Sequence, residues 1–451
     1  MTGKDNLIIK DGRIIDPSQG LDALGDLVIT QGKIAAIVTD GTLPYEAMDY
    51  PVLEAGGLIV CPGLVDIHCH LREPGFEEKE TIATGTHAAA KGGLTTVCCM
   101  PNTNPPIDTR ATVEYVQRVA REQGAVRVLP IGCITRGQRG EELAEMGELA
   151  SAGAVAFSDD GHPVANSRIM RHAMEYSRAF GLPVIDHCEE PSLAEGGAMN
   201  EGLVAARLGL KGIPDAAEEI MVARDIVLAE LTGARLHLAH LSTAGSVELV
   251  RRAKAKDLPV TAEVTPAHLT LTEDWVTEHG PMYDTNTKVN PPLRTRRDVE
   301  ALIEGLRDGT IDAIATDHAP HTWEDKACEY AYATFGISCF ETALGSVLSL
   351  VHSGRLDLNT MISKMTAEPA GIIGRSAPDG LGTLKVGAPG DITIFDPDAE
   401  WVVEPEKFVS KGKNTPLAGV TLKGRVAATV VGGKVVFQDT QAREAASGGR
   451  R

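Results

Sequence analysis

The middle of the chain alternates eight short apolar runs with stretches of helical periodicity, and this alternation constrains the fold more than any other feature. The apolar runs cover 64–68, 95–100, 126–131, 154–158, 183–187, 235–240, 260–264 and 311–316. Helices are predicted over 80–91, 111–122, 141–150, 167–180, 216–232, 246–255 and 296–307. This order is typical of βα units on a parallel sheet. Eight strands in about 310 residues predict an α/β fold of the (β/α)8 TIM-barrel type. An open doubly wound sheet is the alternative, but no Gly-rich phosphate-binding turn follows the first strand.

Both ends of the chain have a different pattern. Residues 1–60 contain short β-rich runs separated by glycine turns, which suggests a small antiparallel sheet, and the same pattern returns near 390–396 and 426–437. We therefore expect residues 1–60 and 376–440 to pair into one small β-sandwich domain beside a barrel formed by 61–375. The polar segment 441–451 is expected to be a disordered tail.

Composition and charge exclude several classes of protein. The 451 residues allow a barrel plus an accessory domain. The net charge of −19 argues against a nucleic-acid binder. No apolar window long enough for a transmembrane helix occurs, and residues 1–6 lack a signal-peptide pattern. Eight cysteines without framework spacing fit a reduced, cytoplasmic protein. Without an apolar span, no membrane partner is expected.

Two histidines stand at the end of the first predicted strand. His68 and His70 are two residues apart, so their side chains point to the same face of the strand and can bind one metal ion between them. Chemistry in a barrel gathers at such strand ends. Other strands end in Asp159, Asp160, His187, His240 and Asp317. Nitrogen and oxygen ligands of this kind suit zinc and admit manganese, cobalt or iron. Neighbouring residues face opposite ways, so only one of Asp159 and Asp160 can take part. The four histidines and two aspartates then make six ligands, more than one zinc uses, so two metals are expected.

Six other histidines are interpreted as structural, namely His237, His87, His172, His268, His279 and His352. His237 lies three residues before His240, and we expect it to face the other side of the strand and pack outward. His87 and His172 lie in the middle of predicted helices, and His268, His279 and His352 show no metal-site spacing.

Motifs along the barrel resemble those of the amidohydrolase superfamily, and within it the long, barrel-plus-sandwich type of bacterial dihydroorotase. The stretches that carry the resemblance include PGLVDIHCHLREPG at 62–75, MPNT at 100–103, NPPLR at 290–294 and ATDHAPH at 315–321. The HxH pair and the aspartate after strand eight are general to the superfamily. LREPG, MPNT, NPPLR and ATDHAPH together are more specific to dihydroorotases.

The resemblance implies two zinc ions per subunit. The implied ligands are His68, His70 and Asp317 for one ion, His187 and His240 for the second, and Asp160 as the bridge. Many relatives bridge with a carboxylated lysine instead. No lysine lies between Lys91 and Lys211, so strand four cannot supply one. The choice of Asp160 over Asp159 rests on the resemblance.

The implied reaction is the reversible cyclisation of N-carbamoyl-L-aspartate to L-dihydroorotate and water, in de novo pyrimidine (UMP) biosynthesis, by a hydroxide that two metals activate. Asp317 is the natural proton carrier, because it would touch a metal and face the water. A substrate carboxylate needs a cation, and Arg72 lies two residues beyond His70. By family position the other substrate contacts are Asn102, Asn290, His321 and the backbone of Phe335 and Gly336. The polar segment 323–334 is expected to be a mobile lid.

Two rival interpretations remain. A hydantoinase, dihydropyrimidinase or allantoinase would share the fold, but the missing bridging lysine and the presence of Arg72 count against it. A catalytically silent scaffold would usually lose metal ligands, and all six are present. The resemblance allows a homo-oligomer and an association with aspartate transcarbamoylase, although no stretch of the sequence identifies such an interface.

Overall fold

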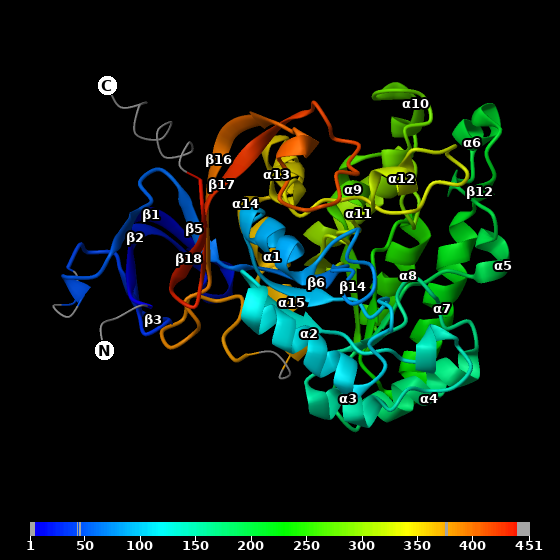
Figure 1. Ribbon diagram of the computed structural model, residues 1–451, viewed down its shortest axis with the longest axis horizontal. Helices are drawn as coiled ribbons and strands as arrows, with labels where there is room; N and C mark the ends of the chain where they lie inside the picture. Colours follow the sequence, from blue (N-terminus) through cyan, green and yellow to red (C-terminus); the bar gives the residue numbers. More distant parts are fainter. Residues whose placement is uncertain (1–4, 43, 45–46, 375–377, 440–451) are drawn as a thin grey trace.

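The protein has two parts, a barrel and a smaller β-domain, which lie side by side (Figure 1). The computed structural model describes residues 5–42, 44, 47–374 and 378–439. The predicted tail at 441–451 lies outside these residues. Strands from the two ends of the chain, drawn in blue and orange-red, share the β-domain, while the cyan to yellow segments form the barrel (Figure 1).

Eight parallel strands form the barrel. Their bounds are β6 (Leu64–Cys69), β7 (Leu94–Cys99), β8 (Arg127–Pro130), β9 (Phe157–Ser158), β10 (Val184–Asp186), β13 (Leu236–Leu238), β14 (Val260–Val264) and β15 (Ala313–Ile314). They make two parallel sheets, β6-β7-β8 and β9-β10-β13-β14-β15. Parallel bridges between Gly132 and Phe157 and between Cys69 and His318 join the sheets at both edges, so the strands close into a ring. The barrel prediction is confirmed.

Helices cover the outside of the barrel. The larger helices are α1 (Ile82–Lys91), α2 (Arg110–Gln123), α3 (Met146–Ala152), α4 (Ser167–Ser177), α7 (Asp215–Thr232), α8 (Ala244–Lys254), α11 (Arg296–Arg307), α13 (Ala343–His352), α14 (Leu358–Met365) and α15 (Ala367–Ile373). Of these, α1, α2, α3, α4, α7, α8 and α11 lie where the periodicity predicts helices, whereas α13, α14 and α15 were not predicted. In α11, a capping box between Thr295 and Asp298 fixes the start of the helix. Its buried Val299, Leu302 and Leu306 recur at helical spacing and face the strands.

Shorter elements sit in the loops above the barrel and between the longer elements. They are α5 (Pro191–Ala194), β11 (Met199–Asn200), α6 (Leu203–Leu208), β12 (Gly212–Ile213), α9 (Pro266–Thr270), α10 (Trp275–Glu278) and α12 (Trp323–Lys326), with 3-10 turns at Pro17–Gln19, Arg136–Gln138, Thr285–Thr287 and Pro405–Lys407. Within the described residues, none of the helices is long and apolar enough to cross a membrane.

The two chain ends build one hydrogen-bonded sheet, which confirms the predicted β-sandwich domain. Its strands are β1 (Leu7–Asp16), β2 (Leu21–Thr30), β3 (Lys33–Val38), β4 (Val52–Glu54), β5 (Ile59–Pro62), β16 (Ile392–Val402), β17 (Thr421–Val431) and β18 (Lys434–Gln438). The order is β18-β17-β16-β5-β1-β2-β3, with β4 beside β1. The sheet is mixed rather than purely antiparallel as expected, because β1 pairs in parallel with β4 and β5. Its apolar core draws on both ends, including Ile14, Val60 and Ile394.

Candidate active site

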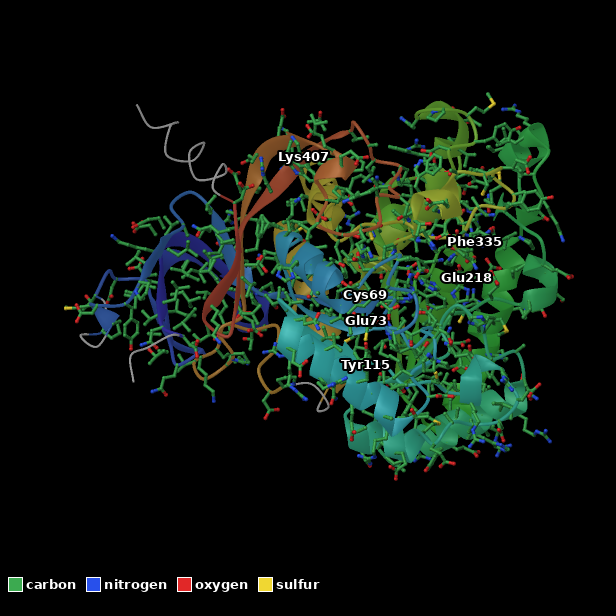
Figure 2. The ribbon with its side chains drawn as sticks, in the orientation of Figure 1. Cys69, Glu73, Tyr115, Glu218, Phe335 and Lys407 are labelled. Atoms are coloured by element: carbon green, nitrogen blue, oxygen red, sulfur yellow. The ribbon has the colours of Figure 1, made fainter. Side chains whose placement is uncertain are left out.

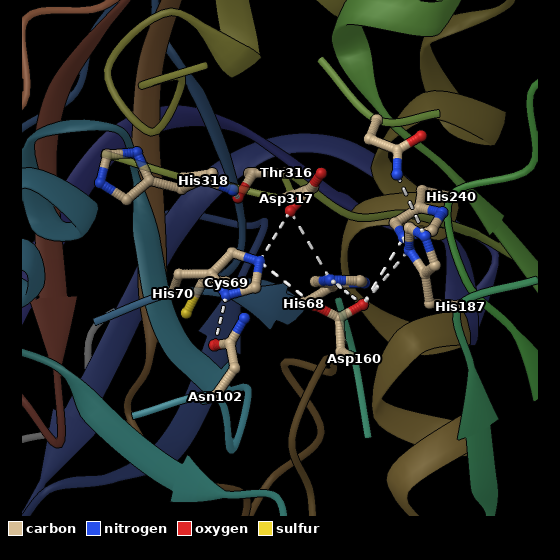
Figure 3. A network of polar contacts seen from close by, with 12 residues as sticks. His68, Cys69, His70, Asn102, Asp160, His187, His240, Thr316, Asp317 and His318 are labelled. Atoms are coloured by element: carbon tan, nitrogen blue, oxygen red, sulfur yellow. Dashed lines mark hydrogen bonds and ion pairs between the residues drawn. The ribbon is translucent and has the colours of Figure 1, made fainter. Parts of the chain in front are cut away.

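Six side chains meet at the C-terminal ends of five barrel strands (Figure 3). They are His68 and His70 from β6 and the residue after its end, Asp160 after β9, His187 after β10, His240 after β13 and Asp317 after β15. Each is buried, and Asp317, with 8% exposed, is the most accessible of them. The structure therefore brings together every side chain that the sequence analysis named as a metal ligand.

The first group comprises His68, His70 and Asp317. Asp317 Oδ1 lies 3.0 Å from His70 Nε2 and 3.6 Å from His68 Nε2. One ligand atom from each residue falls within 4.8 Å of the others. The three side chains can hold a single cation between them.

The second group comprises His187 and His240, and Asp160 lies between the two groups (Figure 3). The Nδ1 atom of His187 is 2.9 Å from Nε2 of His240. Asp160 Oδ1 is 3.6 Å from His240 Nε2 and 3.3 Å from His68 Nε2. The other oxygen of Asp160 is 3.5 Å from His70 Nε2. One carboxylate thus faces both histidine groups.

The donor atoms at the centre fit a divalent cation. Within the described part of the chain, His68 Nε2 and Asp160 Oδ1 are buried without a hydrogen-bond partner. Leaving such atoms unpaired is costly unless a cation binds them. Burial alone would raise the pKa of the Asp160 carboxyl, but His68, His240 and His70 hold that pKa well below its usual range. The set of imidazole nitrogens and carboxylate oxygens therefore suits a divalent metal.

A buried network behind the centre corrects the expectation for His237. Its ring is fully buried, and Nε2 lies 3.0 Å from Glu263 Oε2. The other oxygen of Glu263 lies 2.6 Å from Nδ1 of His68. The prediction that His237 packs outward is wrong, because β13 ends at Leu238 and the alternation of faces does not extend to His240 beyond it. The acidic Glu263 inside an apolar strand was the available signal for this network.

The two aspartates after β9 have separate roles. Asp159 Oδ1 accepts hydrogen bonds from the backbone of Ile134 (2.8 Å) and Thr135 (3.0 Å). Asp160 instead faces the histidines, and its own N–H donates to Ser158 Oγ at 3.0 Å. Asp159 thereby ties the end of β9 to the neighbouring loop, and Asp160 is the carboxylate that reaches the centre.

Arg72 and His321 lie together at one side of the site. The Nε of Arg72 donates to the carbonyl of Pro320 at 3.2 Å, and Nη2 lies 3.2 Å from His321 Nε2. Burial, followed by the neighbouring Arg72, lowers the pKa of His321 to about 2, so its ring is neutral. A guanidinium beside a neutral imidazole can receive an anionic group.

The loop that carries Arg72 is fixed by its neighbour Glu73. One oxygen of Glu73 accepts from the Tyr115 hydroxyl of α2 at 3.0 Å, and the other accepts from the N–H of Ile82, the first residue of α1, at 2.8 Å. Figure 2 shows Glu73 beside Tyr115. The LREPG stretch is therefore anchored on two helices.

The two predicted asparagines both contact metal-ligand candidates. Asn102 Oδ1 lies 2.9 Å from His70 Nδ1. Asn290 Nδ2 donates to Glu189 Oε2 at 2.8 Å and lies 3.4 Å from His187 Nε2. Among the described residues, Asn290 Oδ1 is buried without a hydrogen-bond partner, so it can accept one from a ligand.

Phe335 and Gly336 form a turn beside His321. The carbonyl of Phe335 lies 2.8 Å from His321 Nε2, and the N–H of Gly336 donates to the carbonyl of Lys288 at 2.9 Å. Gly336 has a φ of 139°, and a Cβ there would lie 2.8 Å from Ala319. Glycine is thus required at this close approach.

Comparison with known proteins identifies the family. A family model described as dihydro-orotase-like matches residues 57–246. A dihydroorotase from Pelotomaculum thermopropionicum is 54% identical over 438 residues, which covers 96% of this chain and 99% of the relative. A dihydroorotase from Geobacter sp. (strain M21) is 53% identical over 433 residues, which covers 96% of this chain and 99% of the relative.

Among solved structures, L-hydantoinase from Arthrobacter aurescens matches with a TM-score of 0.85 at 27% identity, over 96% of each chain. Dihydropyrimidinase from Brevibacillus agri NCHU1002 shares the fold, with a TM-score of 0.83 at 22% identity over 96% of this chain and 95% of the other. Full-length identity above one half places this chain in the dihydroorotase family.

Proposed function

We propose that the protein interconverts N-carbamoyl-L-aspartate and L-dihydroorotate in pyrimidine biosynthesis. The observation that carries the proposal is that Asp160 lies between two histidine groups while Arg72 and His321 lie together at the same site. The first feature suits a metal-dependent hydrolase, and the second suits a substrate that bears a carboxylate. The names of the relatives support the same reaction.

Two zinc ions are proposed for the centre. The proposed ligands are His68, His70 and Asp317 for one ion, His187 and His240 for the other, and Asp160 for both. When bound, such ions polarise a carbonyl oxygen and lower the pKa of water towards neutrality. Asp160 suits the shared position because its Oδ1 lies between His68 and His240, one from each histidine group, while Oδ2 faces His70.

Asp317 is proposed to carry the proton. Its Oδ1 contacts His70 and His68, whereas Oδ2 takes part in neither contact. In ring opening, water adds to the ring carbonyl and the C–N bond breaks. The carboxylate of Asp317 accepts the proton of the water and delivers it to the leaving nitrogen, and ring closure reverses these steps.

The remaining residues are proposed to orient the substrate. Arg72 binds its carboxylate, with Asn102 and His321 as helpers. The unpaired Oδ1 of Asn290 can accept a ring N–H. The carbonyl of Phe335 has a second lone pair for the ring in addition to its bond to His321.

One further ring contact is proposed for the N–H of Gly336. It already donates to Lys288. Because an N–H has a single hydrogen, donation to the substrate ring requires that the hydrogen bond from Gly336 to the Lys288 carbonyl breaks first.

The rival activities are those of hydantoinases and allantoinases. They are tested because the fold is similar to that of L-hydantoinase. Metal-loaded protein should be assayed with dihydroorotate, hydantoin and allantoin, and with carbamoyl-aspartate in the reverse direction. We expect turnover of dihydroorotate and carbamoyl-aspartate and little of the other two. Failure to turn over dihydroorotate with metal present overturns the proposal. A cytoplasmic location, homo-oligomerisation and association with aspartate transcarbamoylase are proposed from the family resemblance alone.

A further inference from the structure

A buried lysine lies in the segment that leads to Phe335. Lys326, the last residue of α12, is 6% exposed. Its Nζ donates to three backbone carbonyls, those of Thr334 at 2.6 Å, Thr285 at 3.2 Å and Lys288 at 3.2 Å. An ammonium group has three N–H donors, so the three carbonyls use all of them.

The charge of Lys326 is held at an energetic cost. Burial, followed by the ammonium of Lys288, lowers the pKa of Lys326 to about 7, while the smaller effects of Asp284 and Asp325 favour its charged form. Its direct hydrogen-bond partners in the described residues are carbonyls rather than carboxylates. An apolar side chain would fill this position more cheaply if filling space were its only role.

Two segments of the chain beside Phe335 supply the three carbonyls: one is residue 334, and the other is the segment 285–288. Thr334 directly precedes Phe335, and the carbonyl of Lys288 also accepts the N–H of Gly336 at 2.9 Å. The Lys288 ammonium lies 4.5 Å from the centre of the Phe335 ring. Lys326 therefore bonds the turn both before and, through Lys288, after Phe335.

The same turn reaches the cation that faces the substrate. The carbonyl of Phe335 lies 2.8 Å from His321 Nε2, and His321 Nε2 lies 3.2 Å from Arg72 Nη2. A continuous series of polar contacts thus runs from Lys326 through Thr334 and the Phe335 carbonyl to Arg72. None of the groups in this series is a proposed metal ligand.

We propose that Lys326 is a positioning residue, which holds the turn at 334–336, and through it His321 and Arg72, in the arrangement that receives the substrate. The role in substrate binding rests on the proposed function. The role in ordering the turn does not, since it follows from the contacts of Lys326 alone.

The test compares wild type, Lys326→Met and the matched control Lys364→Met. Lys364 is also 6% exposed but lies on α14, where its Nζ is 3.9 Å from Glu368. Hydrogen exchange is measured by mass spectrometry on metal-loaded protein. We expect amides of 327–336 to exchange roughly tenfold faster in Lys326→Met only, because the ordered turn is less populated. The KM for dihydroorotate should rise roughly tenfold in the same variant, with kcat nearly unchanged and metal content unchanged.

Each outcome decides one part of the proposal. Unchanged exchange at 327–336 in Lys326→Met overturns it, and so does a fall in kcat with KM unchanged. Should Lys326→Met not fold, Lys326→Gln, which keeps two donors, is measured instead and should give intermediate exchange and KM values. If wild type fails to turn over dihydroorotate, the proposed function is refuted, while the exchange data still test the ordering role.

Discussion

Replacing Arg72 by methionine tests how the site selects a carboxylate. In the described residues, Arg72 Nε donates to the carbonyl of Pro320 and Nη2 lies 3.2 Å from His321 Nε2, so at least three of its five guanidinium N–H groups remain for a bidentate contact. Removing one partner of a desolvated charge pair costs about 2–5 kcal/mol. Because Arg72 is only partly buried, we take the lower part of this range, roughly 2–4 kcal/mol. That corresponds to a loss of roughly 30- to 1,000-fold in kcat/KM for dihydroorotate.

The assay compares two rings that differ only in the carboxylate. Dihydrouracil lacks the carboxylate of dihydroorotate, so Arg72→Met should leave the slow turnover of dihydrouracil nearly unchanged. Arg235→Met serves as the matched control, because Arg235 also binds backbone carbonyls, those of Gly181 and Ile372, but stands just before β13 at the opposite end of the barrel. Equal losses on both substrates would mean that Arg72 supports the fold rather than the carboxylate. An unchanged rate on dihydroorotate would refute the reasoning outright.

Two further predictions concern the buried groups around the centre. Glu263→Gln leaves a single acceptor for the two rings of His68 and His237, so zinc affinity in a competitive chelator titration should fall about 10- to 100-fold, and an unchanged affinity would contradict the ordering role of Glu263. Burial lowers the pKa of His268, whose Nε2 donates to the carbonyl of Pro291, from 6.5 to about 4. Between these pH values the unfolded chain binds more protons, so the free energy of unfolding should fall by roughly 3 kcal/mol as the pH drops from 6.5 to 4. In urea titrations His268→Gln should lose this part of the pH slope, and a slope equal to that of wild type would count against the assignment.

The barrel and its strand ends were predictable because they depend on local patterns. The run at 260–264 is β14 with the same bounds, and the helix predicted at 296–307 is α11, since periodicity and a capping residue fix both elements within a few residues. In a closed parallel barrel, the ends of all strands must meet on one face. Side chains such as His187 and Asp317, far apart in sequence, are therefore brought together by topology alone.

Contacts behind and around the centre were less accessible to sequence reasoning. The inward position of His237 was missed because alternation of faces was extended past the last residue of the strand. Glu263, which contacts His68, is 195 residues from it in the sequence, and His321, which contacts Arg72, is 249 residues from it. Such pairs depend on how loops fold over the barrel, and neither periodicity nor spacing encodes that.

The central claim is that one aspartate bridges two metal ions. The most direct measurement is the metal content per chain, by mass spectrometry of protein purified without chelator, for wild type, Asp160→Ala and the neighbouring control Asp159→Asn. The account predicts about two metals in wild type and in Asp159→Asn, and at most one in Asp160→Ala. Retention of the full wild-type metal content in Asp160→Ala would contradict it.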